Sequence, residues 1–526
     1  MANETTDVLI IGTGFGGSIP GYYLAAGGAR VIMLERGPRL SSDEFTQSLQ
    51  VGGYTRILDS IGGTGINVTA GNCVGGSSVV YYAASLRAPS FIFERRGTLG
   101  RRLWPASITR QTLDPWYRRV EHALPVSELS WNDVPYAGGV FAAACTRAGH
   151  TCQPVPVAVD LARCTNCNWM ANGCIFDAKR SMLLNYIPGA EASGAEIRPL
   201  HEVQAIQRAK TAGYRYAVSY LRLDPNDYSV PVGSGLIEAK IVILAAGTMG
   251  TPVILQRSAE FLGDMPPAVG RHFSANGDRI ALAALDEGKV RDLLGLQRTR
   301  RVAYDAFPIG KPISSMTFDY LDPSAPEFSR FALQQLFAPP LTNTVFGVDG
   351  SPSWFGIDKR ELTSRWRSWL TIAAFTEDAN EGVFVGPPPK TGNFTRLGPL
   401  GVGQLRYDVA PETQHGFDLA DAASRSIMTL DGLATFHLVT STNNIQCAHP
   451  LASCRIGDDP ATSALDDQHE LRGHPGIFVT DASSVPTSLC VNPSLTVAAL
   501  AERASSILLE RAASYGVAVA GPVPPP

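Results

Sequence analysis

The sequence predicts an α/β protein, α+β overall, in which a Rossmann-like dinucleotide-binding domain built from separate segments is joined to a second domain. Three observations support this prediction. The chain has 526 residues, which is more than one ordinary domain core needs. Its first apolar run leads directly into the glycine pattern Gly12-x-Gly14-x-x-Gly17. A further segment dense in small residues lies at 71–89, outside the first βαβ pattern.

The first 35 residues have the pattern of a complete βαβ unit. Val8–Ile11 is apolar and is predicted to be a strand, and the glycine pattern follows it at once. An amphipathic helix is expected next, and a second strand at Arg30–Leu34 ends at Glu35. The strand, helix and acidic residue together make this match more specific than the glycines alone.

Each glycine of the pattern has a physical role in binding a dinucleotide. Gly12 permits the tight turn, Gly14 lets a pyrophosphate approach the backbone, and Gly17 lets the helix pack closely on the sheet. Unpaired N–H groups at the helix start favour the anionic phosphates. Glu35 can bind both ribose hydroxyls of an adenosine and disfavours NADP. The pattern does not distinguish NAD from FAD. The alternative interpretation of the pattern is a glycine-rich turn that binds no ligand.

A second segment, "GNCVGGSSVVYYAASLRAP" at 71–89, is dense in small residues. Such a segment lets backbone N–H groups come within hydrogen-bonding distance of a flat ligand, and a flexible surface loop is the alternative interpretation. The residues expected to contact the ligand are Gly71, Asn72, Gly75, Gly76 and Ser77.

Together with the C-terminal segment "GHPGIFVTDASSVPTSLCVNPSLTVAALAERASSILLE", these motifs resemble the glucose-methanol-choline (GMC) flavoprotein oxidoreductases, most of all the branch of bacterial cholesterol oxidases. The resemblance implies FAD as cofactor. It also implies that His449, in an HPL motif, and Asn492, in a VNP motif, lie beside the flavin. The stretches "VGRHFSANGD" (269–278) and "TEDANEGVF" (376–384) are similar to further landmarks of the family.

The resemblance extends to other cofactor contacts. The segment at 241–255 is similar to the family's second strand and turn beside the cofactor, and Asp481 would bind the ribityl chain. The cofactor-binding residues that the resemblance adds are Val203, Gly247, Asp481, Asn492 and Pro493. One position departs from the pattern, because Tyr81 stands where cholesterol oxidases carry an asparagine near the isoalloxazine.

His449 and Asn492 are the expected catalytic residues. Oxidation of an alcohol by a flavin requires a group that takes the hydroxyl proton, and an imidazole titrates near neutrality. Asn492 precedes Pro493 and a helix-like run, which predicts Asn492 at the N-cap and Pro493 at the first helical position. Such a helix start would direct its positive end at the flavin pyrimidine ring. A structural histidine and a simple helix cap are the alternatives.

The cysteines raise the question of a metal. Cys447-x-His449-x₄-Cys454 lacks a fourth ligand and a usual zinc spacing, so both cysteines are predicted to be buried thiols. Cys164, Cys167 and Cys174 resemble a four-cysteine pattern of some GMC relatives, with Met170 at one position. Three thiolates and a thioether suit an iron–sulfur cluster poorly, so no metal is expected, and a disulfide or a reduced cluster remains.

The predicted function is FAD-dependent transfer of hydride from a hydrophobic alcohol to flavin N5, with O₂ expected as the electron acceptor. Dehydrogenases share these motifs, and a lyase with a structural flavin or a redox flavoprotein using Cys164, Cys167 and Cys174 are the alternatives. Asp319 is interpreted as a surface carboxylate, so no isomerase step is assigned.

Composition sets the remaining expectations. The net charge is −4 without long basic runs, so no nucleic-acid partner is expected. The acidic start and the lack of a long apolar stretch predict a cytoplasmic protein without a signal peptide or membrane span. The predicted FAD-binding domain comprises residues 1–99, 196–279 and 445–515. The predicted substrate domain comprises residues 100–195 and 280–444 and contains an antiparallel sheet covered by helices. Residues 516–526 are predicted to form a flexible Pro-rich tail.

Overall fold

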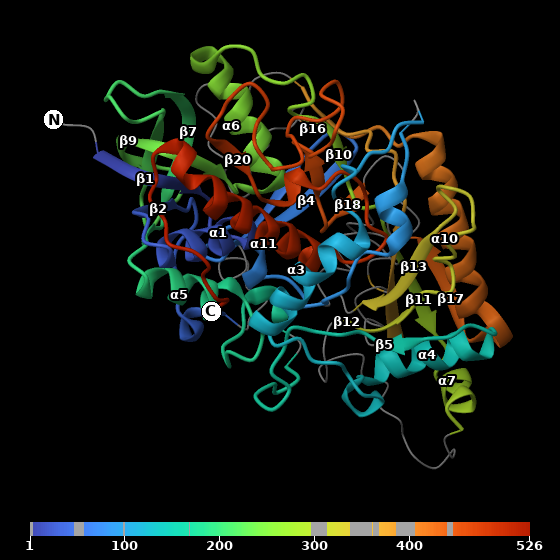
Figure 1. Cartoon of the computed structure of the whole chain (residues 1–526). Coiled ribbons are helices and arrows are strands. Elements are labelled where there is room, and N and C mark those ends of the chain that lie inside the picture. Colours follow the sequence, from blue (N-terminus) through green and yellow to red (C-terminus); the bar gives the residue numbers. More distant parts are fainter. Residues whose placement is uncertain are drawn as a thin grey trace.

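The computed structural model describes residues 4–46, 57–97, 100–167, 169–295, 313–336, 360, 368–385, 405–438 and 445–526. Within these ranges two large sheets lie side by side, each covered by helices (Figure 1). The main helices are α1 (Phe15–Ala26), α3 (Arg110–Ala123), α4 (Tyr136–Arg147), α5 (Tyr186–Ala192), α6 (Gly247–Leu262), α7 (Glu287–Leu293), α10 (Pro411–Thr429) and α11 (Ser494–Arg511).

The first sheet has the strand order β6-β2-β1-β9-β8-β7, and β20 also pairs with β9. Its strands are β1 (Glu4–Ile11), β2 (Val31–Leu34), β6 (Glu196–Arg198), β7 (His201–Arg208), β8 (Tyr216–Leu223), β9 (Pro231–Leu244) and β20 (Ile477–Val479). β6, β2, β1, β9 and β20 are parallel, whereas β8 and β7 extend the sheet in the antiparallel sense. The predicted Rossmann-like α/β arrangement is confirmed.

The strand β9 connects distant parts of the chain. Its first half pairs with β8, its last three residues pair with β20, and its other edge pairs with β1. The strands of a parallel sheet are buried on both faces, which explains the continuous apolar runs of β1 and of β9 after residue 240. Segments from the start, middle and end of the chain therefore share one sheet.

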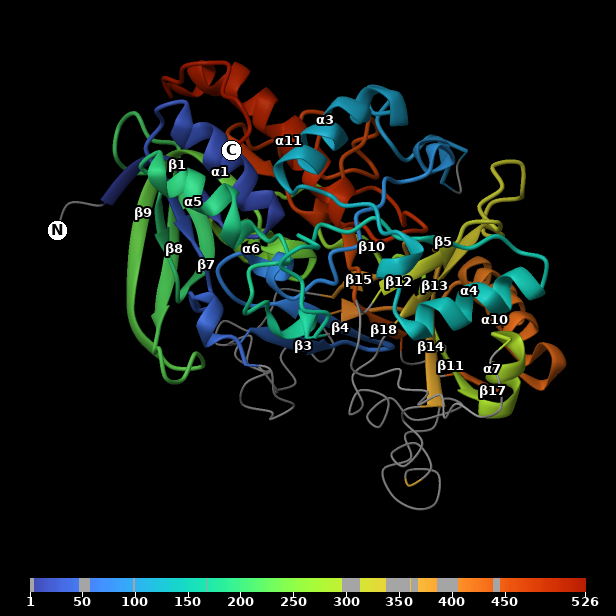
Figure 2. The same cartoon turned by 90° about the horizontal axis from the view of Figure 1, so that it is seen from below.

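Helices α1, α5 and α11 form a layer on this sheet (Figure 2). We predicted an amphipathic helix after the glycine pattern, but α1 is buried along 11 of its 12 residues. The reason is that α11 and α5 also pack against α1. Helix α6 packs against β7, the strand at one edge of this sheet.

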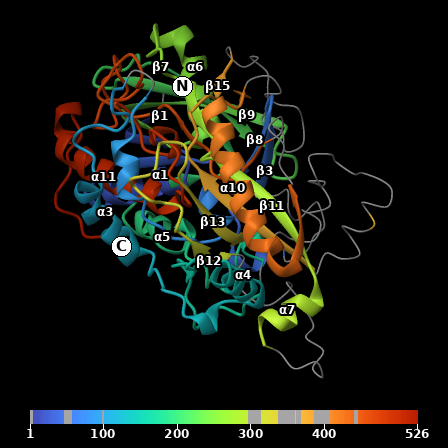
Figure 3. The ribbon, with the colours of Figure 1, turned by 90° about the vertical axis from the view of Figure 1, so that its right-hand side faces the viewer.

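The second sheet is antiparallel, with the order β17-β11-β14-β13-β12-β5. Its strands are β5 (Gln153–Pro154), β11 (Asp278–Leu285), β12 (Ile313–Thr317), β13 (Phe331–Leu336), β14 (Trp369–Thr376) and β17 (Ala434–Leu438). Helices α10 and α4 pack on one face (Figure 3). Along β13, Phe331 and Leu333 belong to the core under these helices, whereas Ala332 belongs to the core shared with the first sheet.

Three small sheets lie between the large ones. β3 (Leu58–Gly62) pairs with β4 (Ile66–Gly71), and β4 pairs with β18 (Ile445–Cys447). β10 (Arg271–Ser274) pairs with β19 (Leu451–Ser453), and β15 (Val383–Phe384) pairs with β16 (Leu405–Arg406). The pairing of β18 with β4 brings the segment around residue 449 close to the second loop of small residues, and the pairing of β19 with β10 brings it close to the start of β11.

Two segments are arranged differently from the predicted domain scheme. Helices α3 and α5 come from residues 100–195, which we assigned to the substrate domain. However, α3 packs on α11 and α5 packs on α1, beside the first sheet. The C-terminal tail, predicted to be flexible, lies against the same layer. Ala520 N donates to Gly27 O at 2.8 Å, and Tyr22 Oη donates to Pro524 O at 3.0 Å. Every helix in the described ranges falls short, in length or in apolar character, of what crossing a membrane requires.

Candidate active site

The glycine pattern forms a turn in which side chains have no space. Gly12 has a φ of +99°, and a Cβ placed there would lie 2.2 Å from Ala245 O. A Cβ on Gly17 would lie 2.0 Å from Gly12 O. These contacts hold the start of α1 against the end of β9. Gly14 is the N-cap of α1, no side chain caps the helix, and its first turn contains no acidic residue. The positive end of α1 is therefore available to an anion.

The second loop of small residues lies directly against this helix start. A Cβ on Gly76, which has a φ of +56°, would lie 2.8 Å from Gly14 Cα, and one on Gly71 would lie 2.7 Å from Gly76 C. Ser77 Oγ accepts a hydrogen bond from Gly71 N at 3.0 Å, and Gly75 N donates to Thr13 Oγ1 at 3.0 Å. The structure thus brings together the glycines of both predicted motifs. Their backbones form a cradle that fits the diphosphate of a dinucleotide.

Asn72 and Glu35 lie beside this cradle. The Asn72 side chain is 3 % exposed, and its Oδ1 accepts no hydrogen bond from the described residues, so it can serve a ligand. Glu35 directly follows β2, as predicted, but its carboxylate already accepts bonds from Thr13 N, Thr13 Oγ1 and Gly37 N at 2.7–3.0 Å. Burial raises the pKa of this carboxyl. Thr13, which the sequence interpretation did not single out, therefore connects Glu35 to the loop at Gly75.

The other predicted cofactor residues occupy the same region. Asp481 Oδ2 accepts from Gly247 N at 2.8 Å and from Thr251 Oγ1 at 2.6 Å, so its carboxylate faces the start of α6. Its backbone N would lie 2.7 Å from a Cβ on Gly16, at the start of α1. Val203 is buried in β7, the strand that begins where His201 N donates to Glu35 O at 2.8 Å.

His449 lies in the turn between β18 and β19. β18 pairs with β4, which leads into the second loop, and β19 pairs with β10, which leads into β11. The imidazole is therefore held at the junction of the two large sheets. Its ring meets Phe375 of β14 edge-on with a centroid distance of 5.3 Å. The side chain is 21 % exposed, which leaves it accessible to a substrate.

Asp278, the first residue of β11, binds the inner side of this imidazole. Its Oδ1 and Oδ2 lie 2.9 and 3.0 Å from His449 Nδ1, and Oδ2 also accepts from Ala448 N at 2.9 Å. The Asp278 side chain is 6 % exposed. A carboxylate only accepts, so these contacts place a proton on Nδ1, and in the neutral imidazole the lone pair is then on Nε2.

Asn492 lies on the other side of the imidazole. Its Nδ2 is 3.2 Å from His449 Nε2, and the side chain is 4 % exposed. The predicted N-cap role is wrong, because α11 begins at Ser494 with Pro493 as N-cap. The amide of Asn492 is engaged by His449 and by Gln334, whose Nε2 donates to Asn492 Oδ1 at 2.9 Å. Because both ends of the amide are occupied, the Asn492 side chain does not cap α11.

A buried asparagine holds the loop that carries Asn492. Asn276 Nδ2 donates to Val491 O at 3.0 Å, and Asn276 Oδ1 accepts from Leu489 N at 2.8 Å. Asn276 and Asp278 both belong to the stretch 269–278 that the sequence marked as a family landmark, so that signal could have identified them. Gln334 has no comparable signal in the sequence.

The cysteines flanking His449 are buried, as predicted. Cys447 is 2 % exposed and Cys454 is 0 % exposed, and burial raises the pKa of both thiols. None of the nine cysteines, all within the described ranges, takes part in a disulfide.

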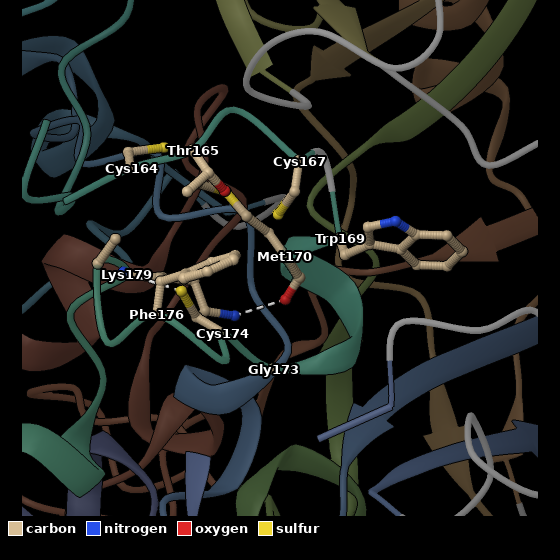
Figure 4. Close-up of a pocket in the computed structure, with 10 residues that line it drawn as sticks. Cys164, Thr165, Cys167, Trp169, Met170, Gly173, Cys174, Phe176 and Lys179 are labelled. Carbon is tan, nitrogen blue, oxygen red and sulfur yellow. Dashed lines mark hydrogen bonds between the residues drawn. The ribbon is translucent and has the colours of Figure 1, made fainter. Parts of the chain in front are cut away.

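Cys164, Cys167 and Cys174 line one small pocket together with Met170 and Lys179 (Figure 4). Lys179 Nζ donates to the carbonyls of Val79, of Tyr81 at 3.2 Å and of Met170 at 2.5 Å. Burial lowers the pKa of Lys179 to about 7. In the part of the chain that the structure describes, no three His, Cys, Asp or Glu side chains come together as metal ligands would. The hydrogen bonds from Lys179 to the carbonyls of Val79 and Tyr81 connect the pocket to the end of the second loop.

Two further residues from the sequence interpretation lie outside the His449 cluster. Asp319 is 31 % exposed and accepts from Thr151 N at 2.7 Å, with His150 Nδ1 at 3.6 Å. This position fits the predicted surface carboxylate. Tyr81 lies near the start of α1, where its ring meets Phe15 edge-on at 5.7 Å and its Oη donates to Arg180 O at 2.6 Å.

Comparison with known proteins identifies the family. Residues 6–276 match the family model of the N-terminal part of GMC oxidoreductases, and residues 408–501 match that of the C-terminal part. The chain belongs to the GMC oxidoreductase family. The family predicted from the sequence is thereby confirmed, and the fold of this chain is that of GMC flavoproteins.

Within the GMC family, the relatives act on different alcohols. The chain is 27% identical to a cholesterol oxidase of Mycobacterium tuberculosis, over 95% of this chain and 90% of that protein. It is 24% identical to a 2-methyl-1,2-propanediol dehydrogenase of Mycolicibacterium austroafricanum, over 97% of this chain and 96% of the relative. Among solved structures, pyridoxine 4-oxidase from Mesorbium loti has a TM-score of 0.66 at 18% identity, covering 95% of this chain and 98% of its own. This GMC protein is accordingly an oxidoreductase.

Proposed function

We propose that this GMC protein is an FAD-dependent oxidoreductase that takes hydride from a hydrophobic alcohol, either secondary, cyclic or sterol-like. The observation that carries the proposal is the pair of His449 and Asn492, whose facing atoms Nε2 and Nδ2 are 3.2 Å apart. One is a proton acceptor and the other a hydrogen-bond donor, which are the two groups that a substrate hydroxyl needs.

The roles of the site residues follow from their bonds. His449 Nε2 accepts the hydroxyl proton as the carbon–hydrogen bond breaks, and Asp278 balances the positive charge that the imidazole gains. Asn492 Nδ2 donates to the substrate oxygen and fixes its position. The apolar ring of Phe375 beside His449 limits water around the reacting hydroxyl.

FAD is the cofactor that fits the cradle. The glycines of both loops, the uncapped start of α1 and the orphan Oδ1 of Asn72 would hold its diphosphate and adenosine end, with Glu35 at the ribose. When bound, FAD supplies the acceptor of the hydride at N5. The start of α11 at Pro493 and Ser494 contains no acidic residue in its first turn, which favours negative charge nearby.

The test is anaerobic mixing of the purified protein with sterols, cyclic alcohols and long-chain alcohols while the flavin absorbance is followed. Bleaching by at least one class supports the proposal. A colourless protein that does not take up FAD would refute it. Conversion of a substrate without bleaching would indicate a lyase, and bleaching only by thiols would indicate a redox flavoprotein.

The electron acceptor is tested in a second step. We propose O₂, because the relatives include a cholesterol oxidase, whereas the propanediol dehydrogenase favours a different acceptor as the second candidate. Reduced protein is mixed with air-saturated buffer. Rapid return of the oxidised spectrum supports an oxidase, and a very slow return supports a dehydrogenase.

A further inference from the structure

A continuous chain of hydrogen bonds crosses the catalytic pair from one buried side chain to another. It runs from Asp278 through His449 and Asn492 to Gln334, over contacts of 2.9, 3.2 and 2.9 Å. Asp278 and Gln334 belong to different strands of the second sheet, β11 and β13. The outer members of the chain are thus held on one rigid element.

We propose that Gln334 is a positioning residue that sets the direction of this hydrogen-bond chain, so that His449 Nε2 is kept free of a proton. The inference rests on the proposed function, because a proton-free Nε2 matters only if His449 receives a proton. It assigns to Gln334 a role that a packing residue at this position would not have.

The orientation of the Gln334 amide follows from its surroundings. Its Nε2 faces two acceptors, Asn492 Oδ1 at 2.9 Å and Met316 Sδ at 3.3 Å. The reversed amide would place its oxygen against both of them and lose both bonds. The side chain is 0 % exposed, so water cannot replace the lost donors. Nε2 therefore stays towards Asn492.

This orientation determines the orientation of the next amide. Because Asn492 Oδ1 accepts from Gln334, Asn492 must present Nδ2 to His449. At the other end of the chain, Asp278 accepts the proton of Nδ1. Both ends thus favour the same tautomer, in which Nε2 is the acceptor. The proton of a substrate hydroxyl then moves to Nε2, and the hydride from the carbon of the same alcohol goes to the acceptor that bound FAD would supply.

The Oε1 atom of Gln334 supports a positioning role. It accepts no hydrogen bond from the described residues although it is buried. A side chain selected only to fill space would satisfy this site better as an apolar residue. The amide is retained for its donor side.

The decisive comparison is between Gln334→Glu and Gln334→Leu. A carboxylate at 334 accepts from Asn492 Nδ2, which turns Asn492 Oδ1 towards His449 and forces a proton onto Nε2. Leu removes the donor without imposing the opposite direction. We expect the rate of anaerobic flavin reduction to fall roughly 10²-fold in Gln334→Glu and roughly 10-fold in Gln334→Leu, with smaller changes in KM. Packing alone predicts the reverse order, because Glu has almost the shape of Gln.

Gln335→Glu is the matched control. Gln335 is the next residue on β13, is 1 % exposed, and uses its oxygen to accept from Ser314 Oγ at 2.7 Å. A carboxylate keeps that bond, so the control places the same charge on the same strand without altering Asn492. We expect it to retain a rate within roughly threefold of the original protein.

A second measurement does not depend on turnover. The chain has nine histidines, so the FAD-loaded protein can be labelled with ¹⁵N-histidine and the ring tautomers read from long-range ¹H–¹⁵N spectra, with His449→Ala assigning the signal. We expect the proton on Nδ1 in the original protein and a proton on Nε2 in Gln334→Glu. A proton on Nε2 of neutral His449 in the original protein, or a faster Gln334→Glu than Gln334→Leu, overturns the inference. If no alcohol reduces the flavin, the proposed function fails and the spectra alone decide the role of Gln334.

Discussion

The Oδ1 atom of Asp278 lies 2.9 Å from Nδ1 of His449, although 171 residues separate the two along the chain. The contact exists because β10 pairs with β19, so that the residues following β10 and those preceding β19 meet. It converts a partly exposed imidazole into an oriented base, since a buried carboxylate fixes both the ring plane and the tautomer.

Replacing Asp278 by Asn should lower the rate of flavin reduction roughly 10–10²-fold. Asn has the same size and its oxygen can still accept from Ala448 N, but its NH₂ group would face Nδ1 and favour the wrong tautomer. Stopped-flow reduction with saturating alcohol measures the effect, and the FAD content should be unchanged. A variant that reduces its flavin as fast as the original protein would show that the carboxylate does not act through His449.

Replacing His449 by Ala should lower turnover by roughly 10² or more, because the hydroxyl proton loses its acceptor. FAD should remain bound, since the glycine cradle does not involve this side chain. Turnover and the flavin-to-protein absorbance ratio are measured together. Near-original turnover would remove His449 from the mechanism.

Replacing Gly76 by Ala should strongly reduce the content of bound FAD. A Cβ there would lie 2.8 Å from Gly14 Cα, and the φ of +56° disfavours Ala, so the two loops must separate. Gly139→Ala is the control, because Gly139 lies in α4 with no atom within 4 Å of an added Cβ. That control should bind FAD fully and have equal or slightly higher stability. Full flavin occupancy in Gly76→Ala would argue against the cradle.

His469 should make the free energy of unfolding dependent on pH. Burial lowers the pKa of this histidine from 6.5 to about 3, its side chain is 0 % exposed, and its Nε2 has no partner among the described residues. Because the folded pKa is lower than the unfolded one, the stabilisation is present above pH 6.5 and is lost as the pH falls towards 3. The slope from this group reaches about 1.4 kcal/mol per pH unit.

His469→Asn tests this dependence. Asn tolerates the φ of +66° at this position and can donate to Val479 O as His469 Nδ1 does, but it does not titrate. Urea unfolding at pH 5 and pH 7 should show a smaller loss of stability on acidification in the variant. An equal loss in both proteins would assign the acid sensitivity to other groups.

Purified protein should contain no stoichiometric iron or zinc. Cys164, Cys167 and Cys174 share a pocket, but in the described ranges their thiols do not form a group with metal-binding geometry, and the fourth position is Met170. Elemental analysis by mass spectrometry measures this directly. One iron or zinc per chain, lost in Cys167→Ser, would establish a metal centre instead.

The local motifs could be predicted because their residues lie close together in the sequence. Gly12, Gly14 and Gly17 follow one strand and begin one helix at a recognisable spacing, whereas the contact of Gly12 with Ala245 O is seen only in the structure. His449 and Asn492 were recognisable through the motifs around them. The structure brings the two side chains together, and the amide of Asn492 contacts the imidazole instead of capping the helix.

Gln334 could not be assigned in the same way. Gln334 meets Asn492 across 158 positions, and only the alternation of β13 between two covered faces turns its side chain towards the site. The burial of α1 was missed for a similar reason, since its outer face is covered by α5 and α11 from distant segments. Such contacts depend on the completed tertiary structure.

The position of β20 in the first sheet also bears on how the protein is made. β20 begins at Ile477 and α11 ends at Arg511, so the last residues of β9 lack one neighbour and α1 lacks part of its cover until residue 511 has left the ribosome. A nascent chain that already contains the first glycine turn still exposes the apolar surface of α1 and an open edge of β9 to other molecules. Chains cut short before α11 should therefore aggregate during synthesis and never acquire colour.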